Sequence, residues 1–331
     1  MHEANTTPTS PVDNQVLHRE LLERRHQLEA ASARSDASQI AELLDAVDQA
    51  LARMHHGTFG ICEICHAPIE SERLIDDPLN RICLECFSPG QRRALEHDLN
   101  LASSIQRRLL PQPVFETPGW EGYYHYEPHG AVSGDFCDVI RDGDETLILL
   151  GDISGKGVSA ALLMSHLSAI FRGLSGSGLP LVEVMGRANR LFCAAIPAGS
   201  FATLVAAHLR ADGGIELSNA GHVPPIVHNG HIDRLPPDGV PLGLFCQSAY
   251  SSQPLQLEPG DRLVLVTDGL IESTDENDTE YGVDALASFV ESHPDEGPYD
   301  LATHLVADAV RFRNGRRAND DTTLMVLRRT E

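Results

Sequence analysis

Apolar side chains in the first part of the chain recur at helical spacing. Between residues 15 and 56 they return every three or four positions, with one polar break near residues 33–38. This pattern predicts two amphipathic helices joined by a turn, that is, a helical hairpin. Residues 1–14 are polar and rich in Thr and Pro, and we expect this tail to be disordered.

A further helix is predicted over the linker 88–111. Ser88 followed by Pro89 is typical of a helix start, and Pro111 is typical of its end. Such a helix either packs on its own domain or serves in signalling or dimerisation. We therefore take residues 88–110 as a candidate homodimer contact and as a route for signals into the following domain.

From residue 112 onward, strands are predicted in runs, with helices placed between the runs. This order favours an α+β fold of antiparallel sheets flanked by helices over a doubly wound parallel sheet. Asn229-Gly230 inside one apolar stretch is a strong hairpin signal. The predicted strands cover 146–152, 201–210, 214–221, 226–235, 262–269 and 319–329, and the predicted helices cover 158–171, 283–292 and 300–313.

The charge of the chain excludes some classes of partner. It contains 25 Lys and Arg against 48 Asp and Glu, a formal net charge of −23. A protein that coats nucleic acid needs a basic face, and adhesion to an anionic membrane needs basic clusters, so we expect neither partner. No segment approaches the roughly 20 consecutive apolar residues of a membrane span, and the first residues lack an apolar signal core. We therefore expect a cytoplasmic protein.

Four of the seven cysteines form two Cys-x2-Cys pairs. Cys62 and Cys65 are separated by 17 residues from Cys83 and Cys86, a spacing expected for a structural zinc site made of four thiolates. Residues 57–87 have too small an apolar core to fold without such a metal. Cys137, Cys193 and Cys246 lack the Cys-x5-Arg loop of cysteine phosphatases, and we expect them to be buried or incidental thiols, because disulfides are rare in a reducing compartment.

The sequence around the cysteines, GTFGICEICHAPIESERLIDDPLNRICLECF, resembles the DksA/TraR family of zinc fingers over about residues 40–87. That resemblance implies RNA polymerase as a partner, since longer members of the family insert a helical hairpin into its secondary channel. Here each predicted arm has only about 20 residues, and Asp36 is the one acid in the break between them. A scaffold or sensor module fits this departure better.

Acidic or glycine-rich turns follow or precede several apolar strands, at 132–138, 151–157, 267–269 and 319–321. Carboxylates are hard ligands suited to Mg²⁺ or Mn²⁺, and two such ions about 4 Å apart can activate water and bind a phosphoryl oxygen. The turn GDISGKG is not a P-loop, because its outer glycines enclose three residues and its lysine is followed by glycine. A dinucleotide-binding fingerprint fails as well, because no acid follows at a second strand end.

Seven ordered motifs resemble the SpoIIE/RsbU branch of the type 2C metal-dependent Ser/Thr protein phosphatases. They are IQRRLLP, VSGDFCDVI, GDISGKGVSAALLMS, NAGHVPP, PLGLF, LVTDGLIES and NDDTTLMVL, and they span about residues 104–329. The resemblance implies an α-β-β-α sandwich over 112–331 with a two-metal centre between its sheets.

The resemblance also implies the ligands of two Mg²⁺ or Mn²⁺ ions. They are Asp135, Asp152, the backbone carbonyl of Ile153, Asp268 and Asp320, while Asp321 is either a further ligand or a residue that orients the site. Cys137 stands where the family commonly has an aromatic residue. Lys156, the one lysine of the chain, is a candidate for substrate phosphate or else an exposed loop residue, and His222 in NAGH is a structural candidate.

These features predict a protein-serine/threonine phosphatase that acts on a regulatory protein, with one structural Zn²⁺ besides the two catalytic ions. The resemblance suggests a phosphorylated anti-sigma-factor antagonist in a partner-switching pathway as the substrate. Three alternatives stay open. They are a silent sandwich that only recruits an antagonist, a transcription factor that binds RNA polymerase or a sigma-factor regulator through its zinc module, and a hydrolase of small phosphorylated molecules.

Overall fold

The structure is a computed structural model, and it describes residues 17–19, 21–22, 24–26, 37–197, 199–316, 318 and 320–330. The tail predicted over 1–14 and most of the break predicted near 33–38 lie outside the described residues. The chain divides into two compact units, 1–98 and 99–331. Each is described separately below.

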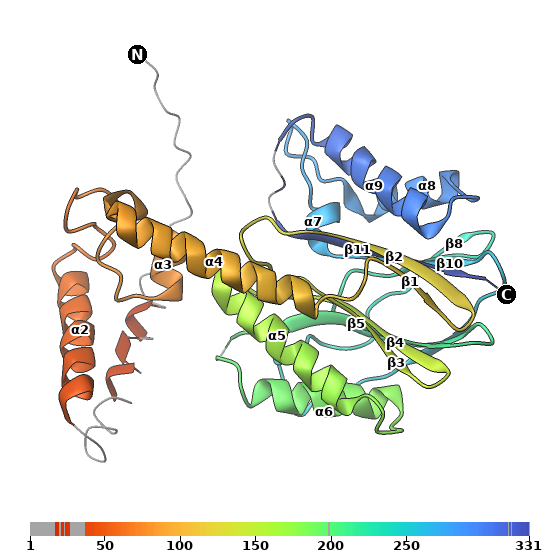
Figure 1. The fold of residues 1–331 in the computed structure, drawn as a ribbon, viewed down its shortest axis with the longest axis horizontal. Coiled ribbons are helices and arrows are strands. Elements are labelled where there is room, and N and C mark those ends of the chain that lie inside the picture. The colour runs from red at the N-terminus through yellow and green to blue at the C-terminus, as the bar shows by residue number, and fades with distance from the viewer. Residues whose placement is uncertain are drawn as a thin grey trace. The chain divides into compact units, whose positions relative to one another are not determined.

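The N-terminal unit consists of helices joined by turns (Figure 1). Its buried apolar residues form two small clusters. Its helices are α2 (Ala37–His55), α3 (Ser71–Asp76) and the 3-10 turn η1 (Leu84–Cys86). Leu21, on the first arm of the expected hairpin, is buried together with Val47 and Ala50 of α2. The helix α4 (Pro89–Leu109) begins in this unit and ends in the next.

The C-terminal unit contains two antiparallel sheets. One has the order β1-β2-β11-β10-β7-β8 and the other the order β3-β4-β5-β6-β9. The strands of the first sheet are β1 (Val114–Thr117), β2 (Trp120–Glu127), β7 (Ile226–His228), β8 (Ile232–Arg234), β10 (Arg262–Val266) and β11 (Thr322–Arg329). Those of the second are β3 (Phe136–Asp142), β4 (Glu145–Ile153), β5 (Ala202–Arg210), β6 (Gly214–Ala220) and β9 (Gln253–Gln256).

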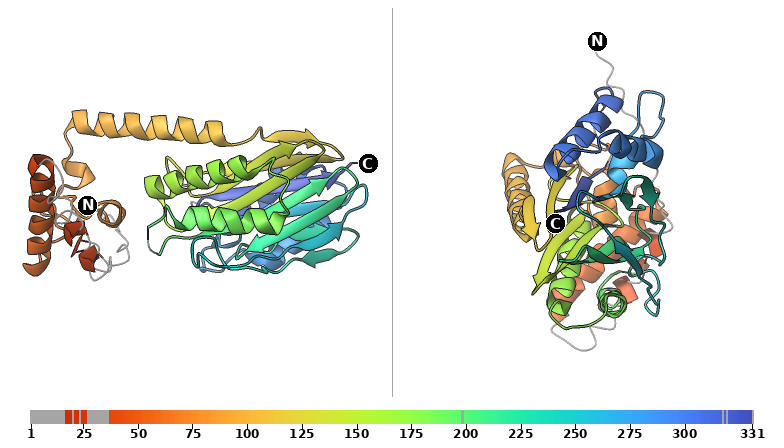
Figure 2. Two further views of the ribbon diagram at one scale, coloured as in Figure 1. Left: turned by 90° about the horizontal axis from the view of Figure 1, so that it is seen from below. Right: turned by 90° about the vertical axis from the view of Figure 1, so that its right-hand side faces the viewer.

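Helices cover the outer face of each sheet, which gives four layers (Figure 2). On β4, Ile148 and Leu150 belong to the core between the sheets, whereas Leu147 and Leu149 pack in the core with α5 (Gly157–Leu174) and α6 (Leu181–Cys193). This alternation is what a strand with two buried faces requires. The helices α8 (Gly282–Ser292) and α9 (Pro298–Phe312) pack on the other sheet, and the short α7 (Asp268–Ile271) follows β10. The predicted α-β-β-α sandwich is confirmed.

Several local predictions can be compared with the strands directly. The Asn229-Gly230 signal is confirmed, since β7 and β8 pair across it with His228 opposite Ile232. The analysis of apolar runs missed β1, β2, β3 and β9, because these strands are short or have polar residues among their apolar ones. β2 is placed in its sheet by pairing with β11, which lies far away in the sequence. β3 is placed by pairing with β4, which has a continuous apolar run.

Among the described helices, α5 alone is long and apolar enough to cross a membrane by length and composition. The sequence analysis expected no segment of that kind. In the fold, one face of α5, including Met164, Leu167 and Phe171, is buried in the core against the second sheet. Packing on that side accounts for part of the apolar content of the helix, while Val158 and Leu162 are exposed.

The expectation that Cys193 and Cys246 are thiols is wrong, because the structure joins them in a disulfide. Cys193 ends α6, and the loop that carries Cys246 is held against this helix by Asn189. The Asn189 amide donates to the Phe245 carbonyl at 2.9 Å and accepts from the Gly243 N–H at 2.8 Å. Tertiary contacts thus bring together two cysteines 53 positions apart, which no local pattern indicates.

Candidate functional site

The four cysteines of the two Cys-x2-Cys pairs converge in the N-terminal unit. The sulfurs of Cys62, Cys65, Cys83 and Cys86 all lie within 4.8 Å of one another. The Cys65 and Cys83 sulfurs are 3.6 Å apart, close to the roughly 3.8 Å edge of a tetrahedron with Zn–S bonds of about 2.3 Å. The backbone N–H of Cys65 lowers the pKa of Cys62 to about 6, which favours a thiolate at neutral pH. The donors and their spacing fit a structural zinc ion.

Arg73 fixes the segment that carries the second cysteine pair. Its guanidinium donates to the Ile82 carbonyl at 2.6 Å and to Asn80 at 3.0 Å, and it stacks over the Phe87 ring. These contacts hold the residues on both sides of Cys83. His66 is not part of the cysteine cluster.

The acidic turns meet at one end of the sandwich because of how the strands pair. β3 and β4 are antiparallel, so Asp135 before β3 and Asp152 near the end of β4 lie at the same end of one sheet. In the same way, Asp268 after β10 and Asp320 before β11 lie at the same end of the other sheet. Hydrogen bonds from Thr267 and Thr323 to Asp135 join the two ends.

Asp135 is buried and held by two threonine hydroxyls. Its Oδ2 accepts from Thr267 Oγ1 at 3.0 Å and from Thr323 Oγ1, and the carboxylate is 1% exposed. Burial, and then the charge of Asp152, raise the pKa of Asp135, while the two hydroxyls act in the opposite direction. The threonines therefore favour the charged form that a metal ligand requires.

Asp321 uses both carboxylate oxygens to hold the loop before Asp135. Oδ1 accepts from the His129 N–H at 2.6 Å, and Oδ2 accepts from the Gly134 N–H at 3.0 Å. Its contacts in the structure are thus those of a residue that orients the site. Its neighbour Asp320 is 40% exposed and pairs with the ammonium of Lys156 at 2.8 Å.

Burial and neighbouring carboxylates raise the pKa values of Asp152 and Asp268. Burial, followed by the charges of Asp268 and Asp320, raises the pKa of Asp152 to about 8. Burial and then Asp320 also raise the pKa of Asp268. Carboxylates that destabilise one another's charge in this way are stabilised when a divalent cation binds among them. This donor set fits hard cations such as Mg²⁺ or Mn²⁺.

Two glycines allow the acidic turns to lie close to one another. A Cβ on Gly134 would lie 3.0 Å from the Ile153 carbonyl oxygen and 3.1 Å from Asp152 Oδ1, so both oxygens face the same point. A Cβ on Gly269 would collide with the Asp321 carbonyl, which allows the turn after β10 to lie against the turn before β11. Larger residues at either position would separate the acids.

The carboxylates are spaced more widely than the cysteines. Among the described residues, only the four cysteines place three or more ligand atoms within 4.8 Å of one another. The spacing of these carboxylates does not match a single ion bound by three of them. Carboxylate and carbonyl oxygens spaced in this way would hold a divalent cation together with water, which Mg²⁺ retains in protein sites.

Lys156 and the start of α5 add positive charge to the acidic end. Gly155 and Gly157 adopt φ angles of +98° and +75°, which L side chains rarely take, and so turn the chain sharply from β4 into α5. The turn places Lys156 at the N-cap of this 18-residue helix. The positive end of the helix dipole therefore lies beside the acidic turns.

The sequence analysis missed some residues that support the site. Thr267 and Thr323 lie inside the quoted motifs, but their hydroxyls carry no signal until the fold brings them to Asp135. Gln106, in the motif IQRRLLP, binds the Ser133 backbone two residues before Asp135.

His222 is buried, and its Nδ1 lies 2.9 Å from the hydroxyl of Thr203, which is paired with Asp152 across β4 and β5. Cys137 is buried between the sheets.

Comparison with known proteins extends this description. The sequence profile of the family described as Stage II sporulation protein E (SpoIIE) matches residues 142–330. The chain is 26% identical over 244 residues to the phosphoserine phosphatase RsbU of Bacillus subtilis (strain 168), covering 72% of each protein. It is 25% identical over 240 residues to the phosphoserine phosphatase RsbP of the same organism, covering 70% of this chain and 58% of RsbP.

A solved structure has the same fold. The SiaA-PP2C domain of Pseudomonas aeruginosa superposes with a TM-score of 0.63 at 21% identity, covering 72% of this chain and 98% of that domain. The shared sandwich and the profile match over more than half of the chain agree on the C-terminal unit. The chain therefore belongs to the SpoIIE family, and its C-terminal unit has the fold of a PP2C domain.

Proposed function

We propose that this protein hydrolyses phosphoserine or phosphothreonine on a regulatory protein and that the reaction depends on two Mg²⁺ or Mn²⁺ ions. The observation that carries the proposal is the meeting of Asp152, Asp268 and Asp320 at one end of the sandwich, where burial and the charges of Asp268 and Asp320 raise the pKa of Asp152, and burial and Asp320 raise that of Asp268. Such a group is costly to keep charged without cations and is therefore built to bind them.

The acidic residues divide the work between binding and support. The ions would be held by Asp152, the Ile153 carbonyl, Asp268 and Asp320. Asp135 would contribute Oδ1, because both threonine hydroxyls donate to its Oδ2. When bound, the ions supply a water of lowered pKa and offset charge on the phosphoryl oxygens. Asp321 keeps the loop before Asp135 in place through two backbone N–H groups.

Lys156 and the N-terminus of α5 favour a phosphate in the same place. The ammonium reaches Asp320 at 2.8 Å, and the helix begins one residue later. Both present positive charge to an anion, and an ammonium adapts easily to a phosphate oxygen. We assign Lys156 to binding of the substrate phosphate.

The substrate we propose is a phosphorylated anti-sigma-factor antagonist in a partner-switching pathway in the cytoplasm. Support comes from the likeness to RsbU and RsbP, both named phosphoserine phosphatases. The cysteine cluster of the N-terminal unit would hold one Zn²⁺ with a structural role, since four thiolates leave no open position.

The test is release of inorganic phosphate from a phosphoserine-carrying antagonist, with and without Mn²⁺. We expect release only with the metal, and Asp152→Asn should lower it by about 10³-fold. The matched control is Asp144→Asn, which alters an exposed carboxylate in the turn between β3 and β4. Tight binding of the antagonist without any release would instead favour a recruiting role.

A further inference from the structure

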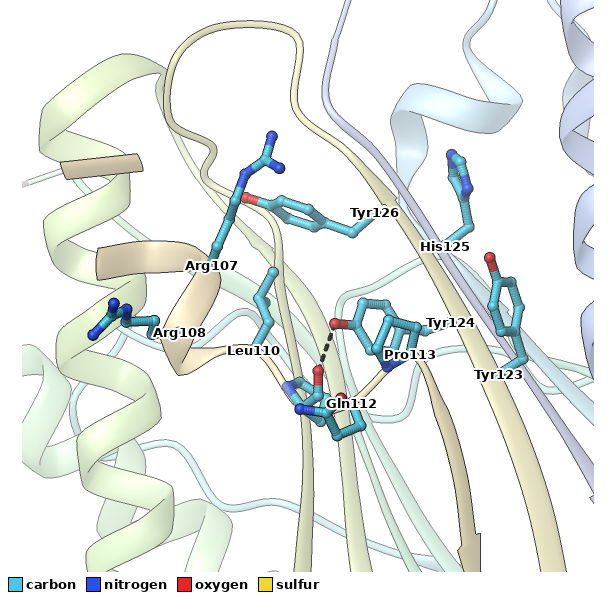
Figure 3. A pocket seen from close by; sticks show the side chains of 10 residues that line it. Arg107, Arg108, Leu110, Gln112, Pro113, Tyr123, Tyr124, His125 and Tyr126 are labelled. Atoms are coloured by element: carbon cyan, nitrogen blue, oxygen red, sulfur yellow. Dashed lines mark hydrogen bonds between the residues drawn. The ribbon is translucent and has the colours of Figure 1, made fainter. Parts of the chain in front are cut away.

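A cavity of about 550 Å³ lies at the junction of α4 and β2, and no residue of the acidic turns is among those that line it. Its walls come from the last turn of α4, the proline-containing segment that follows it, and the middle of β2 (Figure 3). Arg107, Arg108, Pro113, Tyr123, His125 and Tyr126 are among its lining residues. Nothing in the proposed reaction uses this cavity.

The lining residues show that the cavity lies on the edge of the strand. Tyr123, Tyr124, His125 and Tyr126 are consecutive, and successive side chains of a strand point to opposite faces of the sheet. A cavity that touches all four residues must therefore open along the strand edge. Figure 3 shows Tyr123 and His125 projecting separately from Tyr124 and Tyr126.

This edge of β2 is not covered by another strand. Pairing with β1 ends where Val114 lies opposite Tyr123, and the next contact is a single hydrogen bond from the Tyr124 N–H to the Pro113 carbonyl at 3.0 Å. Among the described residues, no strand pairs with that side of β2 from Tyr124 to Glu127. Since the Tyr124 N–H is already bonded to Pro113, the open edge runs from His125 to Glu127, about 10 Å, which can receive the end of a short extended peptide.

The charge of the cavity is the opposite of that of the rest of the unit. Residues 113–331 contain 31 acids and 14 bases. Arg107 and Arg108 make no side-chain hydrogen bond or ion pair with the described residues, whereas many other arginines of the chain are paired. Two guanidiniums beside an open strand edge fit carboxylates, which they bind through paired N–H groups. An acidic segment would be repelled elsewhere on this unit and attracted here.

The cavity also adjoins the proposed catalytic end. The Tyr126 hydroxyl donates to Gln106 Oε1 at 3.2 Å, and the same oxygen accepts from the Ser133 N–H. β2 ends at Glu127, and His129, two residues later, donates its backbone N–H to Asp321. A peptide that extends this sheet along β2 would therefore run toward the acidic turns.

We propose that this cavity docks an acidic, extended segment of the phosphoprotein substrate, which adds as a strand to the free edge of β2. The inference rests on the proposed function, because it supplies the recognition of a protein substrate that the acidic turns alone do not provide. Main-chain hydrogen bonds give the segment its alignment, and Arg107 and Arg108 select its acidic side chains.

Binding is tested separately from catalysis, with the full chain and its metals. The probe is a fluorescein-labelled, unphosphorylated ten-residue peptide rich in Asp and Glu, followed by fluorescence anisotropy. Arg107→Ala/Arg108→Ala should weaken its binding by about 10-fold at low salt, as expected for charge-assisted contacts. The control is Arg190→Ala, another exposed arginine without a described partner, on α6 over the other sheet.

Two further arms test the charge and the strand. A peptide with Lys in place of its acidic residues should bind the Arg107→Glu/Arg108→Glu variant more tightly than it binds the unaltered chain. The amides of the peptide form two alternating sets, and only one set faces β2. N-methylation of that set should abolish binding, and N-methylation of the other set should not. Binding that is equal in all variants, or is unaffected by either methylation, would overturn the proposal.

A kinetic arm distinguishes failure of docking from failure of the proposed function. Two phosphoserine peptides are compared, one with acidic flanks and one with the same positions changed to Ser and Gln. The chain should prefer the acidic peptide in kcat/KM by about 10-fold, and the double alanine variant should lose that preference. An equal loss on both peptides would overturn docking. If the acidic probe binds but neither peptide is turned over, docking is supported and the proposed phosphatase function is contradicted.

Discussion

Gln106 near the end of α4 binds both backbone groups of Ser133 in the loop that leads to Asp135. Its Nε2 donates to the Ser133 carbonyl at 2.7 Å, and its Oε1 accepts from the Ser133 N–H at 3.0 Å. Gln106 is 4% exposed, so this pairing is shielded from water. The end of α4 is therefore tied directly to the loop before Asp135, and we propose that a signal along this helix would reach the acidic turns through this contact.

Gln106→Ala should lower phosphatase kcat and destabilise the C-terminal unit. The change leaves a buried N–H and a buried carbonyl of Ser133 without partners, which costs about 1–3 kcal/mol. Thermal denaturation and phosphate release measure the two effects. Gln247→Ala, at an exposed loop position, is the control. A variant with unaltered kcat would show that the loop keeps its conformation without α4.

Thr323→Val should raise the Mn²⁺ concentration needed for half-maximal activity. The substitution keeps the shape of the side chain but removes a hydroxyl that donates to the buried Asp135 carboxylate. Hydrogen bonds to charged groups contribute about 1.5–3 kcal/mol, so a shift of about 10-fold or more is expected. Titration of activity with Mn²⁺ measures it.

The neighbouring Thr322 provides the control for that experiment. Successive side chains on β11 point to opposite faces, and the Thr322 hydroxyl makes no hydrogen bond with the described residues. Thr322→Val should leave the Mn²⁺ requirement unchanged. If both valine variants shift it equally, the contact with Asp135 is not the cause.

Cys83→Ser should reduce bound zinc to well below one ion per chain and unfold the segment around it. The cluster then has three thiolates, and its small core cannot replace the metal, whose binding free energy is about 10–16 kcal/mol in zinc-finger peptides. Elemental analysis and limited proteolysis measure the effect. Cys246→Ser, outside the cluster, should retain full zinc content.

Arg172→Ala should destabilise the C-terminal unit by about 3 kcal/mol. Its guanidinium binds both carboxylate oxygens of Asp138, whose side chain is 1% exposed, and also the Leu109 carbonyl at the end of α4. The alanine variant leaves a buried charge without its partner. Urea denaturation measures the loss.

The pairing of Arg172 with Asp138 is isolated by a double variant. Asp138→Leu/Arg172→Leu removes both charges, and it should recover most of the stability that Arg172→Ala loses, because no unpaired charge stays buried. If the double variant is no more stable than the alanine variant, packing rather than charge explains the effect.

The sequence by itself predicted most of the helices and strands and the types of residue at the two candidate metal sites. Helical periodicity, alternating apolar strands and the Asn229-Gly230 turn predict most of the C-terminal layers, because these signals arise from neighbouring residues. The spacing of Cys62, Cys65, Cys83 and Cys86 likewise predicts a zinc site, since each pair forms within one tight turn. The acids at strand ends were found for the same reason.

Only the tertiary structure decided how distant residues meet. The threonine bonds to Asp135, the Gln106 contact with Ser133 and the disulfide between Cys193 and Cys246 join positions from 27 to 188 apart in the sequence. Strands β1 and β2 were missed because their polar residues are accommodated by pairing partners rather than by a local pattern. Pairing and packing act through space, and periodicity along the chain carries no information about which distant side chains they bring together.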